Sequence, residues 1–153
     1  MERARTLAEA SIYITSRRGA VDTSLREDAE SWAVVVDDTF EVEVPYADEA
    51  AARDAGARFG VGPSELLDAG QWARVASEYA TRAFVEGDTL NWVYASEALR
   101  EVLKFLPPEA GEVPASAFWT PDGRAAYFAN PKLFTRARLL EEMEIYRDGY
   151  EAP

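Results

Sequence analysis

Residues 32–45 decide the fold, and they read WAVVVDDTFEVEVP. An apolar run comes first, an Asp-Asp pair interrupts it, and apolar and acidic residues then alternate strictly. The alternation puts the apolar side chains on one face of a strand and Glu41 and Glu43 on the other. Two such runs joined by an Asp-rich turn predict a β-hairpin, and Pro45 ends it because proline cannot donate to the strand ladder.

Two further segments carry strand signals. Residues 11–15, SIYIT, are β-branched and aromatic, and they predict an N-terminal strand. Residues 117–128 contain Pro-Asp-Gly between two apolar runs, and Asp-Gly supplies the positive φ that a tight hairpin turn needs. We therefore expect a second β-hairpin, with Trp119 and Tyr127 flanking its turn.

Helical patterns occupy the rest of the chain. Residues 47–59 are rich in alanine, and residues 64–84 and 89–105 place apolar side chains at three- and four-residue spacings. Asn130 followed by proline supplies a cap and a first-turn residue for one more helix. The sequence therefore predicts about four helices.

Strands grouped apart from helices are typical of the α+β class. The expected fold is α+β, with a mostly antiparallel sheet that is built from two β-hairpins plus an N-terminal strand and packed with about four helices. A length of 153 residues and the absence of repeats or low-complexity tracts favour a single compact domain over residues 1–153.

The charge of the chain is one-sided. The formal net charge is −12, and no basic residue occurs among the 26 residues from 27 to 52. This segment holds nine carboxylates: Glu27, Asp28, Glu30, Asp37, Asp38, Glu41, Glu43, Asp48 and Glu49. Such a field repels nucleic acid and anionic membranes and attracts basic surfaces. We therefore expect no direct contact with nucleic acid or membrane, and a basic protein as the partner.

The chain contains no cysteine and no histidine. Thiolate nucleophiles, disulfides, zinc–thiolate sites, imidazole bases and Ser-His-Asp triads are therefore excluded. No glycine-rich nucleotide loop occurs either. These absences favour a non-enzymatic protein, and we expect no catalytic residue, no metal and no cofactor.

Two chemical alternatives for the acids are weaker. Glu41 and Glu43 would share a strand face about 6–7 Å apart, within reach of a glycosidase pair, but no apolar neighbour lies between them to raise one pKa. Asp37 and Asp38 offer oxygen ligands for Ca²⁺ or Mg²⁺, but the spacing of a calcium loop is absent.

The leading hypothesis is an acidic binding protein that inhibits a basic target, such as a toxin, nuclease or glycohydrolase domain, in the manner of an immunity protein or antitoxin, or that mimics nucleic acid. The candidate partner-binding residues are Asp37, Asp38, Glu41, Glu43, Trp119 and Tyr127. The carboxylates would steer the encounter, and Trp119 or Tyr127 would anchor the interface. The alternative is a small pocket-bearing domain, either a ligand binder or an enzyme that uses carboxylate and tyrosine.

The sequence also suggests where the protein works. Arginine outnumbers lysine by fourteen to two, a bias typical of high-GC bacterial coding. The first residues, MERAR, carry no apolar segment of a signal peptide, and no apolar run approaches the roughly 20 residues of a membrane span. We therefore expect a cytoplasmic bacterial protein.

Overall fold

The computed structural model describes residues 2–152. The chain divides into two compact units, Met1–Leu66 and Leu67–Pro153, called here the N-terminal unit and the C-terminal unit. Each is described by itself. The α+β class is confirmed, and the single domain expected over residues 1–153 stays a prediction.

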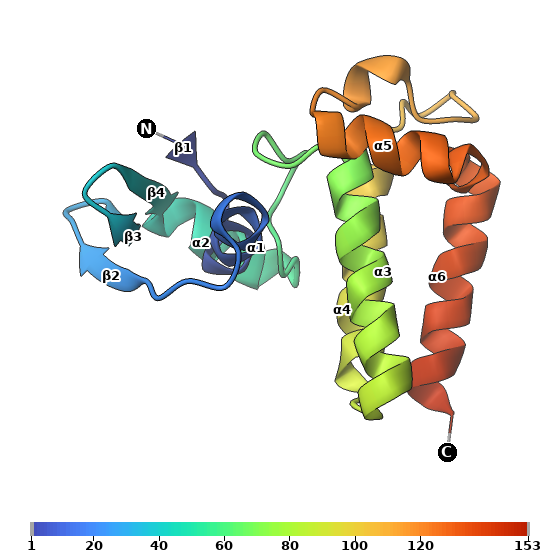
Figure 1. Ribbon diagram of the computed structural model, residues 1–153, viewed down its shortest axis with the longest axis horizontal. Helices are drawn as coiled ribbons and strands as arrows, with labels where there is room; N and C mark the ends of the chain where they lie inside the picture. Colours follow the sequence, from blue (N-terminus) through green and yellow to red (C-terminus); the bar gives the residue numbers. More distant parts are fainter. Residues whose placement is uncertain (1, 153) are drawn as a thin grey trace. The chain divides into compact units, whose positions relative to one another are not determined.

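The N-terminal unit combines a four-stranded sheet with two helices (Figure 1). Its elements are β1 (Glu2–Arg3), α1 (Leu7–Arg18), β2 (Ser24–Glu27), β3 (Ser31–Asp37), β4 (Phe40–Pro45) and α2 (Tyr46–Ala55). The strand order is β1-β4-β3-β2. Strands β2, β3 and β4 are antiparallel, whereas β1 runs parallel to β4. The sheet is therefore mixed, with two antiparallel pairings and one parallel pairing, rather than wholly antiparallel.

The hairpin predicted from residues 32–45 forms as β3 and β4. Val34 lies opposite Val42, and Trp32 lies opposite Val44. Val42 and Val44 are fully buried, while Glu41 and Glu43 are half-buried on the other face of β4. The strict alternation thus placed each side chain on the expected face.

The prediction of an N-terminal strand at residues 11–15 is wrong, because these residues belong to α1. Thr6 caps the helix by accepting a hydrogen bond from the backbone N–H of Glu9. Ala10, Tyr13 and Ile14 are buried at helical spacing. The β-branched residues therefore follow the 3.6-residue period, and burial of this face outweighs their preference for strands.

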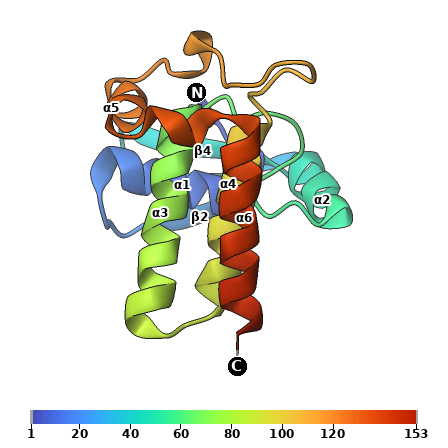
Figure 2. The ribbon, with the colours of Figure 1, turned by 90° about the vertical axis from the view of Figure 1, so that its right-hand side faces the viewer.

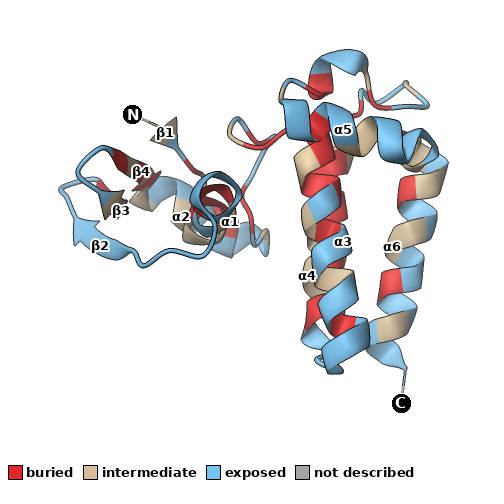
Figure 3. Cartoon of the chain, viewed as in Figure 1, coloured by how far each residue is buried: buried red, intermediate tan, exposed pale blue. Residues whose placement is uncertain are grey.

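The C-terminal unit is helical. Its elements are α3 (Ala69–Glu86), α4 (Leu90–Leu103), η1 (Ala115–Ala117), α5 (Pro121–Ala129), η2 (Pro131–Phe134) and α6 (Arg136–Glu151). A three-residue turn joins α3 to α4, and the two helices lie side by side with α6 packed along α4 (Figures 1 and 2). Figure 3 shows the buried stripe of α3 in red, which includes Trp72 and Ala76. Residues 2–152 therefore contain six α-helices rather than about four.

The prediction of a second hairpin over residues 117–128 is also wrong, because residues 121–129 form α5. Thr120 caps this helix by accepting a hydrogen bond from the backbone N–H of Gly123, and Pro121 occupies the first turn. Gly123 has no positive φ. It is needed for another reason: a Cβ on Gly123 would collide with the carboxylate of Asp68. The Thr-Pro-Asp-Gly sequence therefore starts a helix instead of turning a hairpin.

The last helix starts later than expected. Pro131–Phe134 form a single 3₁₀ turn, and α6 begins at Arg136 after Thr135, whose side chain accepts from the backbone N–H of Arg138. A threonine N-cap thus outcompetes the Asn-Pro signal upstream.

Candidate functional site

The four predicted acids of the β3–β4 hairpin occupy two positions. Asp37 and Asp38 lie at the turn and are exposed. Glu41 and Glu43 share the face of β4 that points away from Val42 and Val44. None of the four is buried, so they can all meet a partner's surface.

Three of these acids form an ion pair with an arginine of another element. Arg18 of α1 lies 2.8 Å from Asp37, Arg26 of β2 lies 3.0 Å from Glu41, and Arg3 of β1 lies 3.6 Å from Glu43. These arginines lie outside residues 27–52 in sequence; the mixed sheet brings Arg3 and Arg26 to the acids, and α1 brings Arg18. The interpretation that no base offsets these acids is therefore incorrect for Asp37, Glu41 and Glu43.

The pairing changes the titration of two of the acids. The Arg18 guanidinium, with hydrogen bonds from the Thr39 backbone N–H and hydroxyl, holds the pKa of Asp37 well below its usual range. The Arg26 guanidinium lowers the pKa of Glu41. Both carboxylates therefore stay charged while they tie α1 and β2 to the hairpin.

We expect Asp37→Asn to lower stability at neutral pH and to lose this effect in acid. The pKa of Asp37 is lower in the folded state than in the unfolded chain, where it is near 3.9. The contribution of Asp37 is therefore complete above the unfolded pKa and fades as pH falls toward the folded value. Urea unfolding midpoints of Asp37→Asn and wild type, compared at pH 7 and pH 3, measure this loss of stability.

Asp38→Asn is the control for this measurement, because Asp38 makes no ion pair with another described residue. The urea unfolding midpoint of Asp38→Asn should equal that of the wild type at both pH values. If the unfolding midpoints of Asp37→Asn and wild type differed by the same amount at pH 7 and at pH 3, the ion pair between Asp37 and Arg18 would be contradicted.

A second acidic group surrounds an aromatic pair. Trp32 and Tyr46 meet edge to face, with ring centroids 4.5 Å apart, and both are half-buried. Glu27 lies directly opposite Trp32 across the β2–β3 ladder. The Tyr46 hydroxyl donates to the carbonyl of Asp28, and its backbone N–H donates to that of Glu30. Acids from β2 and the following turn thus flank the two rings.

We call this group the Trp32–Tyr46 surface; its members are Trp32, Tyr46, Glu27, Asp28, Glu30 and Asp48, the last from the first turn of α2. Burial raises the pKa of Tyr46, and the charges of Glu27 and Asp28 raise it further. Within residues 2–152, Glu27, Glu30 and Asp48 make no ion pair, and all three are exposed. Their charge is therefore available to a partner.

The sequence pattern does not reveal the aromatic part of this surface, because Trp32 lies in an apolar run, which is typical of a buried strand. The available signal was Tyr46, which follows the strand-ending Pro45 within the base-free segment. Tyrosine is enriched at interfaces, because its ring is apolar and its hydroxyl is polar.

Trp119 and Tyr127 lie in the C-terminal unit, and the hairpin whose turn they were expected to flank is replaced by α5. Trp119 is 43% exposed and packs edge to face on Phe105. Tyr127, on α5, is half-buried and packs against Phe118 and Phe134. Trp119 therefore keeps an accessible ring, whereas Tyr127 mainly supports an aromatic cluster.

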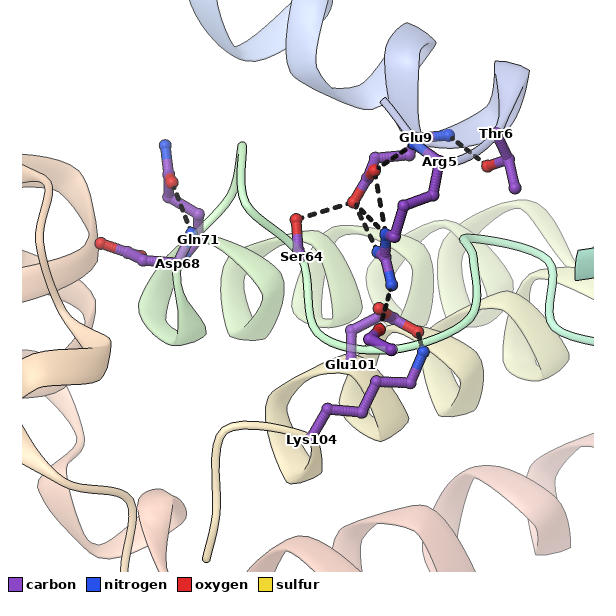
Figure 4. A network of polar contacts seen from close by, with 9 residues as sticks. Arg5, Thr6, Glu9, Ser64, Asp68, Gln71, Glu101 and Lys104 are labelled. Carbon is purple, nitrogen blue, oxygen red and sulfur yellow. Dashed lines mark hydrogen bonds and ion pairs between the residues drawn. The ribbon is translucent and has the colours of Figure 1, made fainter. Parts of the chain in front are cut away.

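The three buried carboxylates of the described chain each have nearby donors (Figure 4). Glu9 receives hydrogen bonds from the Arg5 guanidinium and from the Ser64 hydroxyl, the latter 2.7 Å long. Asp68 accepts from the backbone N–H of Gln71 and, at 2.8 Å, from the backbone N–H and hydroxyl of Thr120.

Glu101, the third of these acids, forms an ion pair with Lys104 at 2.6 Å. Two of the buried acids hold neighbouring segments in place: Glu9 fixes the loop at Ser64 to α1, and Asp68 joins the N-termini of α3 and α5. These contacts give the acids a structural role.

A groove of about 300 Å³ lies between α1 and β2 of the N-terminal unit. Its aliphatic lining comprises Leu7, Ile14, Val21, Leu25 and Val34, and serine and threonine hydroxyls complete it. A groove with this lining suits an apolar side chain or a small apolar ligand.

In comparisons with known proteins, no family model, curated protein or solved structure matches the chain at significant similarity. Among residues 2–152, no helix combines the length and the apolar character needed to cross a bilayer. The same described residues bring no three acidic side chains together in a group that could hold a metal ion.

Proposed function

We propose that this chain is a non-enzymatic acidic protein of the bacterial cytoplasm that binds and neutralises a basic protein. The target class is a toxin, nuclease or glycohydrolase domain, bound in the manner of an immunity protein or by mimicry of nucleic acid. The observation that carries the proposal is the Trp32–Tyr46 surface, where Glu27 and Glu30, both exposed and without an ion pair to a described residue, lie beside an aromatic pair, with Asp48 two residues after Tyr46.

The charge of the N-terminal unit supports this role. Its sequence holds fourteen carboxylates against seven arginines, and Arg18, Arg26 and Arg3 are already engaged with hairpin acids. A surface with excess negative charge accelerates association with a positive cleft, by about 10- to 1,000-fold at low salt. The acids would thus act mainly by raising the rate of association with the partner.

The aromatic pair would supply the contact that slows dissociation. Tryptophan and tyrosine are the side chains that most often dominate interface energies, and cations bind favourably over their rings. A lysine or arginine of the partner could lie against Trp32 or Tyr46 while Glu27 and Glu30 pair with its charge. Trp119 and Tyr127 remain the second proposed contact, with Trp119 the more accessible of the two.

The hairpin acids take a lesser part in this proposal. Asp37, Glu41 and Glu43 already interact with arginines, so a partner's base would have to compete with Arg18, Arg26 or Arg3. Asp38, which is exposed and lacks such a pair, contributes fully. We therefore expect Glu27, Glu30 and Asp48 to matter more than the paired acids.

The alternative function is a pocket-bearing ligand binder, which the groove between α1 and β2 favours. Its aliphatic and hydroxyl lining would take a small apolar molecule with one polar group. Binding of such a ligand would protect α1 and β2 from hydrogen exchange without any dependence on salt.

The test of the proposed function is capture from the source cells with three baits. The triple variant Glu27→Gln, Glu30→Gln, Asp48→Asn removes three charges from the Trp32–Tyr46 surface. The matched control, Glu86→Gln, Glu109→Gln, Asp148→Asn, removes three exposed charges from the C-terminal unit. A basic protein should be retained by wild type and control at low salt and should be lost from the triple variant. Equal retention on all three baits would contradict the proposal.

A further inference from the structure

Strand β2 leaves one side of the sheet open. It is the last strand in the order β1-β4-β3-β2, it pairs only with β3, and all four of its residues are exposed. An edge strand presents unpaired backbone N–H and C=O groups to solvent. Proteins protect such an edge with charged side chains, proline, a bulge or a very short strand. Strand β2 has four residues and no proline, and of its two charged residues Arg26 is already paired with Asp28 and Glu41, which leaves Glu27 to select what approaches the edge.

The groove beside this edge gives a second strand a place for its side chains. Leu25 lies opposite Val34 in the β2–β3 ladder, and both line the groove with Ile14 of α1. Leu25 is 52% exposed and Val21, at the mouth of the groove, is 42% exposed. A strand added next to β2 would therefore cover apolar surface that the chain leaves in water.

The charge along the edge selects the occupant. Glu27 lies two residues after Leu25 and so projects on the same face of β2. Glu27 makes no ion pair with a described residue, and Asp22 precedes the strand with its side chain exposed. A strand that pairs with β2 would thus meet an aliphatic contact at Leu25 and a negative charge two positions away.

We propose that the basic partner adds an extended segment to the free edge of β2, with an aliphatic residue beside Leu25 and a lysine or arginine beside Glu27. This inference rests on the proposed function and specifies how the partner is held. Main-chain hydrogen bonds to β2 would provide affinity, and an aliphatic and a basic residue two positions apart, on one face of the added strand, would provide specificity. Because Glu27 also belongs to the Trp32–Tyr46 surface, the added strand would extend that surface along the sheet edge.

The probe for this site is a capped eight-residue peptide with valine and lysine in turn at every second position and threonine between them, so that valine and lysine share one face; it is titrated against the full chain. Two peptides serve as controls: one has glutamate in place of lysine, and one is the lysine–valine peptide N-methylated at every residue, which cannot pair with a strand. We expect the first peptide alone to bind and to protect the amides of residues 24–27 from hydrogen exchange. No binding at millimolar peptide, or equal binding of the N-methylated peptide, would overturn the proposal.

The variant Leu25→Lys locates the site. It places a charge in the groove and should weaken binding of the lysine–valine peptide by about tenfold, which corresponds to the loss of one buried aliphatic contact. Val61→Lys changes an exposed aliphatic residue elsewhere in the same unit and should leave binding unchanged. Glu27→Gln offers a milder second variant, and circular dichroism checks the fold of all three.

The same variants separate this inference from the proposed function. If Leu25→Lys still captures the basic partner while the triple variant of Glu27, Glu30 and Asp48 loses it, the acidic surface binds the partner without strand addition, and only the present inference fails. If Leu25→Lys and the triple variant both capture the partner as wild type does, both proposals fail.

Discussion

Gly70→Ala should strongly destabilise the C-terminal unit. A Cβ on Gly70 would overlap the backbone carbonyl of Gly123, and the backbone cannot move aside as a flexible side chain can. Overpacking typically costs about 1–3 kcal/mol, and this contact should reach or exceed the upper end. Urea unfolding followed by circular dichroism measures the change.

Gly111→Ala is the matched control in the same unit, since nothing lies within 4 Å of a Cβ at that position and its φ is not positive. It should change stability by no more than about 0.5 kcal/mol. If Gly70→Ala were as mild as Gly111→Ala, the close approach of the N-termini of α3 and α5 would be disproved.

Arg5→Met should destabilise the N-terminal unit by about 3–5 kcal/mol, the usual cost of removing one partner from a buried ion pair. Glu9 is 1% exposed, and Arg5 supplies its cation, leaving only the Ser64 hydroxyl and backbone donors after the change. Arg5 also donates to the carbonyl of Gly62. Denaturant unfolding with a probe in the N-terminal unit, such as Trp32 fluorescence, reports the loss.

Two further variants show whether the loss comes from the uncompensated charge. The double variant Arg5→Met, Glu9→Leu removes both charges and should recover part of the stability, because a buried pair can often be replaced by apolar side chains. Arg53→Met changes an exposed arginine of α2 and should be nearly neutral. A double variant less stable than Arg5→Met alone would show that packing, and not charge, dominates at this position.

The sequence predicted those parts of the fold whose period is visible over a long enough window. The alternation of residues 40–44, the apolar run before it and the acidic turn between them were together sufficient for β3 and β4, and long apolar stripes were sufficient for α3 and α4. The prediction for residues 11–15 failed because a short run with no turn signal beside it does not distinguish a strand from one and a half turns of helix. Residues 117–128 failed because Pro-Asp-Gly serves equally well as a turn and as a helix start. Only the packing of Gly123 against Asp68 decides between them.

The candidate site was predictable in composition but not in geometry. The base-free segment correctly indicates where acids gather. It does not reveal that Arg3, Arg18 and Arg26 pair with three of them, because those contacts depend on the strand order β1-β4-β3-β2 and on the position of α1. The parallel pairing of a two-residue strand, β1, carries no sequence pattern of its own.

Association kinetics with the purified basic partner test the central claim most directly. Rate constants should be measured by surface plasmon resonance at low and physiological ionic strength. The baits are wild type, the triple variant Glu27→Gln, Glu30→Gln, Asp48→Asn, and the control Glu86→Gln, Glu109→Gln, Asp148→Asn. We expect the triple variant to associate several-fold more slowly and with a flatter salt dependence, while the control matches wild type. An unchanged association rate and salt slope in a correctly folded triple variant would contradict the account.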